Sequence, residues 1–136
     1  MKYLWIDANI ILRFITGSPP EMAEKTLELM KRVEKGEVCL RVSSLVLAEV
    51  VWVLSSFYKF SKHEIANSLI PFINADGIAT ENPTLLVQAL QVMADKDIDF
   101  VDAYLASLAR FHDEIICSFD DDFKKLDVKL ITPPGK

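Results

Sequence analysis

The sequence predicts an α/β fold: a three-layer sandwich in which helices flank a central, mostly parallel five-stranded sheet. Five short apolar runs with strand character are spread along the 136 residues, and most are separated by segments with the apolar spacing of a helix. Strands that alternate with helices pair in parallel, because each helix returns the chain to the same end of the sheet. The carboxyl ends of the strands then share one edge, where ligands bind in open sheets of this kind.

Local signals place the elements of the first half. Pro20 and Glu21 suit a first helical turn, because proline lacks the N–H that would be unpaired there and an acidic side chain favours the helix N-terminus. Ser61 followed by Glu64 matches a capping box. The predicted elements are a strand over 2–7, helices over 10–15 and 18–35, a strand over 38–42, and helices from 43 or 44 to about 58 and from 61 onward.

The second half is read in the same way. Asp76-Gly77 marks a turn, Asn82-Pro83 starts a helix, and Asp99 opens the next one. The chain shows no internal repeat, linker or low-complexity segment, so residues 1–136 are expected to form a single domain. The predicted elements are a strand over 78–80, a helix from 83, a helix over 99–109, strands over 114–118 and 128–132, and a loose tail over 133–136.

Composition limits the classes of protein. No apolar run reaches the roughly 20 residues of a membrane span, and no signal peptide is evident, so we expect a cytoplasmic protein without a membrane partner. The net charge of −5 argues against a broad phosphate-binding surface. That argument weakens if the acidic residues surround a metal ion, because a bound cation is among the largest charges in its surroundings.

Three acidic residues stand at positions typical of a functional site. Asp7 closes the first predicted strand and Asp120 comes just after a later one, although aspartate at such a place also serves as a helix cap. Glu49 interrupts a helix that is apolar nearly all round and is expected to be mostly buried. An unpaired ionised carboxylate there would cost several kcal/mol, so Glu49 binds a cation, pairs with a basic side chain or lies at an exposed edge.

Further acidic residues lie close to these in the predicted fold. Asp99 and Asp102 are three positions apart at a helix start, and we assign Asp99 mainly to capping and Asp102 to the site. Asp122 is either a supporting residue of the site or the first-turn acid of a short helix. Carboxylate oxygens without neighbouring His or Cys suit Mg²⁺ or Mn²⁺. The sequence therefore predicts a metal-dependent hydrolase.

Four segments carry a resemblance to a known family. Ile6-Asp7-Ala8-Asn9, the helix segment ending at Glu49, the segment from Asp99 to Ala106, and Ser118-Phe119-Asp120 resemble, in this order, the signatures of PIN-domain ribonucleases. The length and the order of motifs are similar to those of VapC-type toxins of toxin–antitoxin pairs. One departure is Ala8, where the family often carries Thr or Ser, so one hydroxyl contact is missing while no metal ligand is affected.

The resemblance implies both a site and partners. It assigns catalysis and metal binding to Asp7, Glu49, Asp102 and Asp120, and makes Asn9 and Ser118 polar helpers. It also implies Mg²⁺ or Mn²⁺, an RNA substrate, a homodimer and a small antitoxin protein that blocks the site. The mechanistic hypothesis is that one or two metal ions activate a water that attacks the phosphodiester, leaving 5′-phosphate and 3′-hydroxyl ends.

Other interpretations stay open at this stage. Arg13, one helical turn beyond Asn9, could reach a phosphate or simply be solvated. A haloacid-dehalogenase-type phosphatase also has Asp after its first strand, but it needs a second Asp two residues on, where this chain has Asn9. A catalytically silent interaction module would use its acidic residues for capping and its apolar helix from Leu45 to Phe60 for a partner. The aromatic side chains of that segment, which could equally be core, would suit a dimer face: Trp52, Phe57, Tyr58 and Phe60.

Overall fold

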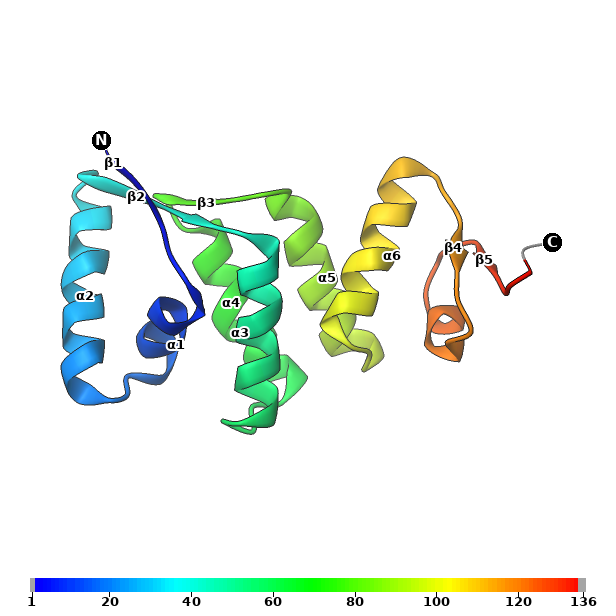
Figure 1. The fold of residues 1–136 in the computed structure, drawn as a ribbon, viewed down its shortest axis with the longest axis horizontal. Coiled ribbons are helices and arrows are strands. Elements are labelled where there is room, and N and C mark those ends of the chain that lie inside the picture. Colours follow the sequence, from blue (N-terminus) through cyan, green and yellow to red (C-terminus); the bar gives the residue numbers. More distant parts are fainter. Residues whose placement is uncertain (1, 135–136) are drawn as a thin grey trace. The chain divides into compact units, whose positions relative to one another are not determined.

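The computed structural model describes residues 2–134 (Figure 1). The chain divides into two compact units, with the division between Pro83 and Thr84, and each unit is described by itself. None of the helices in the described residues is both long enough and apolar enough to cross a membrane.

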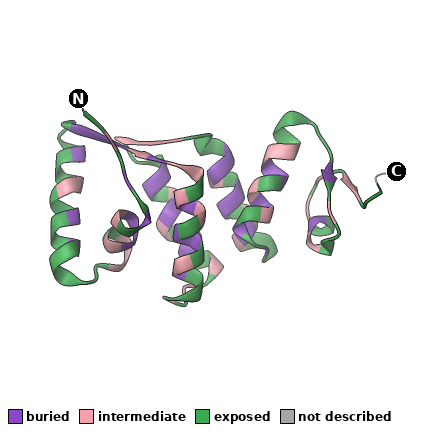
Figure 2. Cartoon of the chain, in the orientation of Figure 1, coloured by how far each residue is buried: buried purple, intermediate pink, exposed green. Residues whose placement is uncertain are grey.

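The first unit contains a parallel three-stranded sheet with β2 between β1 and β3. Its central strand is the most buried, since four of the five residues of β2 are buried (Figure 2). The strands are β1 (Lys2–Trp5), β2 (Val38–Val42) and β3 (Ile78–Thr80), and the helices are α1 (Ala8–Thr16), α2 (Pro20–Glu34), α3 (Ser44–Ser56) and α4 (Lys62–Asn74).

The second unit consists of two helices followed by a small parallel strand pair. α5 (Pro83–Lys96), which begins at the division, precedes α6 (Phe100–His112), and β4 (Ile116–Cys117) pairs with β5 (Leu130–Ile131) across the 3-10 helix η1 (Asp121–Lys125). A small apolar cluster holds η1 against α6 and β4, and its buried members are Ala106, Ile116 and Phe123. This cluster fixes the segment that follows β4 against the helix that carries Asp102.

The expected α/β class with parallel strands is confirmed, but the single five-stranded sheet is wrong: the strands form one sheet of three and another of two. The apolar run at 114–118 contains only two strand residues. Its backbone N–H groups bond to the β5 segment: Ile116 N–H donates to Lys129 O, and Ser118 N–H donates to Ile131 O. An apolar pattern identifies a strand, but it does not identify the neighbour with which the strand pairs. The three-layer arrangement stays a prediction.

Element ends differ from the prediction in one place that matters for the site. β1 ends at Trp5, so Asp7 is not the last strand residue. Asp7 is instead the N-cap of α1: its backbone is extended and its Oδ1 accepts from the backbone N–H of Ile10 at 3.3 Å. Asp7 thus fulfils a capping role whatever else it does.

A tight contact between α2 and the turn before β3 gives a stability prediction. Gly77 has a positive φ of 85°, and a Cβ at this position would collide with Cγ1 of Val33. Gly77→Ala therefore adds a clash to the backbone strain and should lower the free energy of unfolding by about 2–4 kcal/mol. Gly17→Ala is the matched control, because Gly17 also has a positive φ but open space around it. Urea denaturation showing equal losses for the two variants would contradict the clash.

Candidate metal centre

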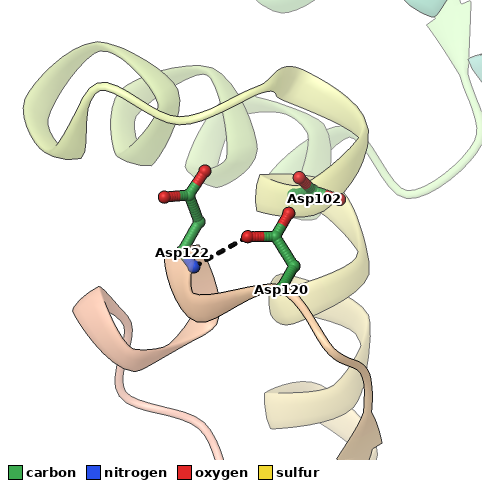
Figure 3. A group of neighbouring side chains, drawn as sticks. All are labelled: Asp102, Asp120 and Asp122. Carbon is green, nitrogen blue, oxygen red and sulfur yellow. Dashed lines mark hydrogen bonds between the residues drawn. The ribbon is translucent and has the colours of Figure 1, made fainter.

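Three carboxylates converge in the second unit (Figure 3). Asp102, Asp120 and Asp122 each offer one oxygen, and these oxygens all lie within 4.8 Å of one another. Asp102 comes from the first turn of α6, while Asp120 and Asp122 belong to the start of η1. Asp102, which lies 18 positions before Asp120 in the chain, therefore has its carboxylate close to those of Asp120 and Asp122.

Short hydrogen bonds fix the turn that carries two of these carboxylates. The backbone N–H of Asp120 donates to Oγ of Ser118 at 2.9 Å, and the backbone N–H of Asp122 donates to Oδ1 of Asp120 at 2.8 Å. Asp120 is thereby the N-cap of η1. Capping occupies one lone-pair direction of a carboxylate that has about four, so the Asp120 side chain keeps acceptor capacity for a ligand.

The electrostatics of the cluster are unfavourable for three bare charges. Burial raises the pKa of the Asp102 carboxyl above its usual value, and the negative charges of Asp120, Asp99 and Asp122 raise it further. One basic side chain partly offsets this charge: Nζ of Lys125 lies 3.3 Å from Oδ1 of Asp122. Like charges this close repel one another, so the cluster gains stability from any cation that enters it.

The donor set fits a hard divalent cation. Its three ligands are all carboxylate oxygens, which suit Mg²⁺ and Mn²⁺ rather than the softer metals held by Cys or His. Mg²⁺ in proteins commonly keeps several waters and uses only one or two carboxylates, so a group of three aspartates is compatible with such an ion. Asp102, Asp120 and Asp122 are accordingly a group of described residues that could hold a divalent cation.

Two residues near the cluster differ from what the sequence suggested. Asp99 occupies the N-cap position of α6, yet its side chain makes no capping hydrogen bond, and its charge acts instead on Asp102. Lys125 was not singled out from the sequence. Its spacing of three from Asp122 in a helical segment is a signal that could have found the ion pair.

The remaining candidate residues belong to the first unit. Oδ1 of Asn9 accepts from Nη2 of Arg13 at 3.4 Å, one turn further along α1. Nη1 of Arg13 also donates to the backbone oxygen of Ser18 at 2.8 Å and to the Tyr58 hydroxyl at 3.2 Å. Arg13 therefore links α1 to two other segments and is not a freely solvated side chain. Its part in phosphate binding stays a prediction.

Glu49 lies on an exposed face of α3, not in its buried side. Its neighbours at helical spacing, Leu45 and Trp52, are 83% and 69% exposed, so the expectation that this helix is mostly buried is wrong for this face. The start of α3 is fixed by two side chains: Ser43 Oγ accepts from the N–H of Val46, and Oε1 of Glu81 accepts from the N–H of Ser44. The sequence left three alternatives for Glu49: a bound cation, a basic partner or an exposed edge. Within this unit its position is that of an exposed edge.

Comparison with known proteins identifies the class. The family model of the PIN domain matches residues 4–129, and the chain therefore belongs to the PIN-domain family. The chain is also similar to Ribonuclease VapC2 of Methanocaldococcus jannaschii, with 26% identity over 91% of this chain and 89% of that protein. The resemblance to VapC-type PIN proteins that the four sequence segments carry is thus confirmed.

Similarity also extends to solved structures. One of them is the crystal structure of VapBC2 from Rickettsia felis bound to a DNA fragment from their promoter, at 20% identity over 97% of this chain and 98% of that one. The TM-score is 0.39, so the likeness in three dimensions is weak.

Proposed function

We propose that this protein is a Mg²⁺- or Mn²⁺-dependent endoribonuclease that hydrolyses RNA phosphodiester bonds, the toxin of a VapBC-type pair. The observation that carries the proposal is the convergence of Asp102, Asp120 and Asp122 within 4.8 Å. Membership of the PIN-domain family and the similarity to a protein named as a VapC ribonuclease support it. We further propose that residues 1–136 act as one PIN domain.

The proposed site has four principal acidic residues. Asp102 and Asp120 hold the ion together with the supporting Asp122, and Asp7 and Glu49 are assigned to the same task by the family resemblance. A bound ion would lower the pKa of a water and polarise the phosphodiester. Asn9, Ser118 and Asp99 are the other supporting residues; of these, Ser118 fixes the Asp120 backbone through its hydroxyl oxygen.

Partners follow from the same assignment. We propose a cognate antitoxin protein that blocks the site, and a homodimer as the working assembly in the cytoplasm. The exposed side chains of Trp52 and Phe57, at 69% and 74%, are available for such an interface. They are equally what a catalytically silent interaction module would present, so activity decides between the two.

The test is an RNA-cleavage assay on protein freed of any bound partner. A labelled mixed RNA pool is incubated with the protein in EDTA, in Mg²⁺ and in Mn²⁺, and the product ends are mapped. We expect cleavage only with metal, and 5′-phosphate and 3′-hydroxyl ends, because water rather than the ribose 2′-hydroxyl attacks. Thermal melting in the same buffers reports metal binding independently, since a ligand that binds only the folded state raises the melting temperature.

Each outcome of this assay has a definite meaning. A 2′,3′-cyclic phosphate product would rule out the metal-activated water. A metal-induced rise in melting temperature without any cleavage would support the metal centre and contradict the nuclease activity. Neither cleavage nor a thermal shift would favour the silent module.

A further inference from the structure

A small cleft in the second unit lies beside the metal centre. It has a volume of about 210 Å³ and is lined by the end of α5, one face of α6 and the end of η1. Ala103, Ala106 and Ser107 form its α6 wall, and their small side chains leave the space open. Small-molecule sites usually occupy about 300–1,000 Å³, so this cleft suits one compact group rather than a whole nucleotide.

The residues that line this cleft carry a net positive charge, whereas residues 84–134 as a whole carry a net negative charge. Residues 84–134 contain ten acidic side chains and five basic ones, namely Lys96, Arg110, Lys124, Lys125 and Lys129. Three of the five basic residues line the cleft, whereas only one of the ten acidic residues, Asp127, does so. Within the described residues, neither Lys96 nor Arg110 forms an ion pair. Most of the basic residues of this acidic segment, three of five, therefore line one cleft.

Lys125 connects this cleft to the metal centre. Its Nζ lies 3.3 Å from Oδ1 of Asp122, while the residue itself lines the cleft. Asp102 and Ala103 are consecutive in α6, so the centre and the cleft wall also meet along the helix. If one phosphate of an RNA backbone lay at the metal centre, a neighbouring phosphate of the same backbone would therefore lie close to the cleft.

We propose that the cleft of Lys96, Arg110 and Lys125 is a phosphate subsite that holds a backbone phosphate of the RNA next to the one at the metal centre. The inference rests on the proposed function. A phosphate is a compact anion, and guanidinium and ammonium groups are the side chains that bind it. The subsite explains how a protein of net charge −5 holds a polyanion without a broad basic surface.

The experiment compares two double variants with the same change in charge. Lys96→Ala/Arg110→Ala removes two cations of the cleft, and Lys124→Ala/Lys129→Ala removes two cations of the same unit outside it. Lys125 is left intact because its loss would also disturb Asp122. Binding of a labelled single-stranded RNA is measured by fluorescence anisotropy across a salt series, with Mg²⁺, in proteins that all carry Asp120→Asn to prevent cleavage.

We expect the cleft variant to bind RNA at least tenfold more weakly than its parent at low salt. The slope of log K against log salt should fall by about 0.7 for each phosphate contact that is lost. The control variant should stay within about twofold. Asp127→Asn should have the opposite effect and tighten binding, since it removes the one acidic side chain of the cleft.

Kinetics without the Asp120 change separate this subsite from the proposed function. Loss of the subsite should raise KM for RNA while kcat stays within about twofold, because the contact is the same before and during the reaction. Equal losses of binding in the two double variants would overturn the subsite as a general charge effect. Unchanged binding and KM in the cleft variant would overturn the subsite and leave the nuclease intact, provided that the unmodified protein cuts RNA with metal. If the unmodified protein neither binds nor cuts RNA, both the subsite and the proposed function are overturned.

Discussion

Asp120→Asn should abolish metal-dependent RNA cleavage, lowering kcat/KM by about 10³-fold or more. Asp120 supplies one of the three convergent oxygens, and a metal's stabilisation of the reacting charge is worth several kcal/mol, with each 1.36 kcal/mol equal to about tenfold in rate. The substitution is mild for the fold, since the amide oxygen of Asn can still accept from the backbone N–H of Asp122. The loss is measured as the rate of cleavage at saturating metal.

The matched control for this prediction is the adjacent residue. Asp121 lies between two cluster members but is outside the cluster, and its Oδ1 pairs with Nζ of Lys124 at 3.0 Å on the surface. Asp121→Asn removes the same charge one residue away and should leave the rate within about twofold. If both variants lost activity equally, general electrostatics rather than metal binding would be the cause, and the assignment of Asp120 would fail.

The sequence predicted the elements of this protein better than their pairing. Capping residues lie where local chemistry puts them, as the Ser61–Glu64 capping box at the start of α4 shows. The apolar run at 114–118 contains the two-residue strand β4, but its pairing with β5 depends on which backbone groups meet across some fourteen residues. Local pattern holds no information about that partner, so the five-stranded sheet could not be tested from sequence.

The site shows the same division between local and long-range information. Asp102 and Asp120 were identified because each stands where an element begins or ends, and the structure brings their oxygens together with one from Asp122. Lys96 and Arg110 were not among the predicted residues, because the cleft that they line is formed by tertiary structure. Lys96 and Arg110 lie fourteen residues apart on different helices, and only the folded second unit places them on one cleft. The assignments of Asp7 and Glu49 stay predictions of the family resemblance.

Asp102→Asn should stabilise the metal-free protein at neutral pH while removing its response to metal. Burial and the charges of Asp120, Asp99 and Asp122 raise the pKa of Asp102 in the folded state. A carboxyl whose pKa is raised by folding contributes stability that is fully present below its unfolded pKa, near pH 4, and is lost as pH rises through the higher folded value. At pH 7 the ionised side chain is therefore a net cost of the metal-free fold.

The size of this effect follows from the distances in the cluster. Two unit charges about 4 Å apart repel by about 1 kcal/mol even in water, and the nearest carboxylate oxygens here lie within 4.8 Å. Removing one charge should raise the free energy of unfolding in EDTA at pH 7 by about 1 kcal/mol, or about 3 °C in melting temperature. The gain should shrink towards zero as the pH falls to about 4.

In the presence of metal, the parent protein should be more stable than the Asp102→Asn variant, the reverse of their order in EDTA. The parent gains stability from Mn²⁺ because the ion binds only the folded centre, whereas Asp102→Asn, lacking one ligand, should gain little. Asp113→Asn is the control, since Asp113 is an exposed acid of the same unit that pairs with Lys129 at 3.4 Å and lies outside the cluster. Melting curves from pH 4.5 to 7.5, in EDTA and in Mn²⁺, test both signs. A variant less stable than its parent in EDTA at pH 7 would mean that Asp102 is a structural anchor and not a strained ligand, because only a repelled carboxylate improves stability when its charge is removed.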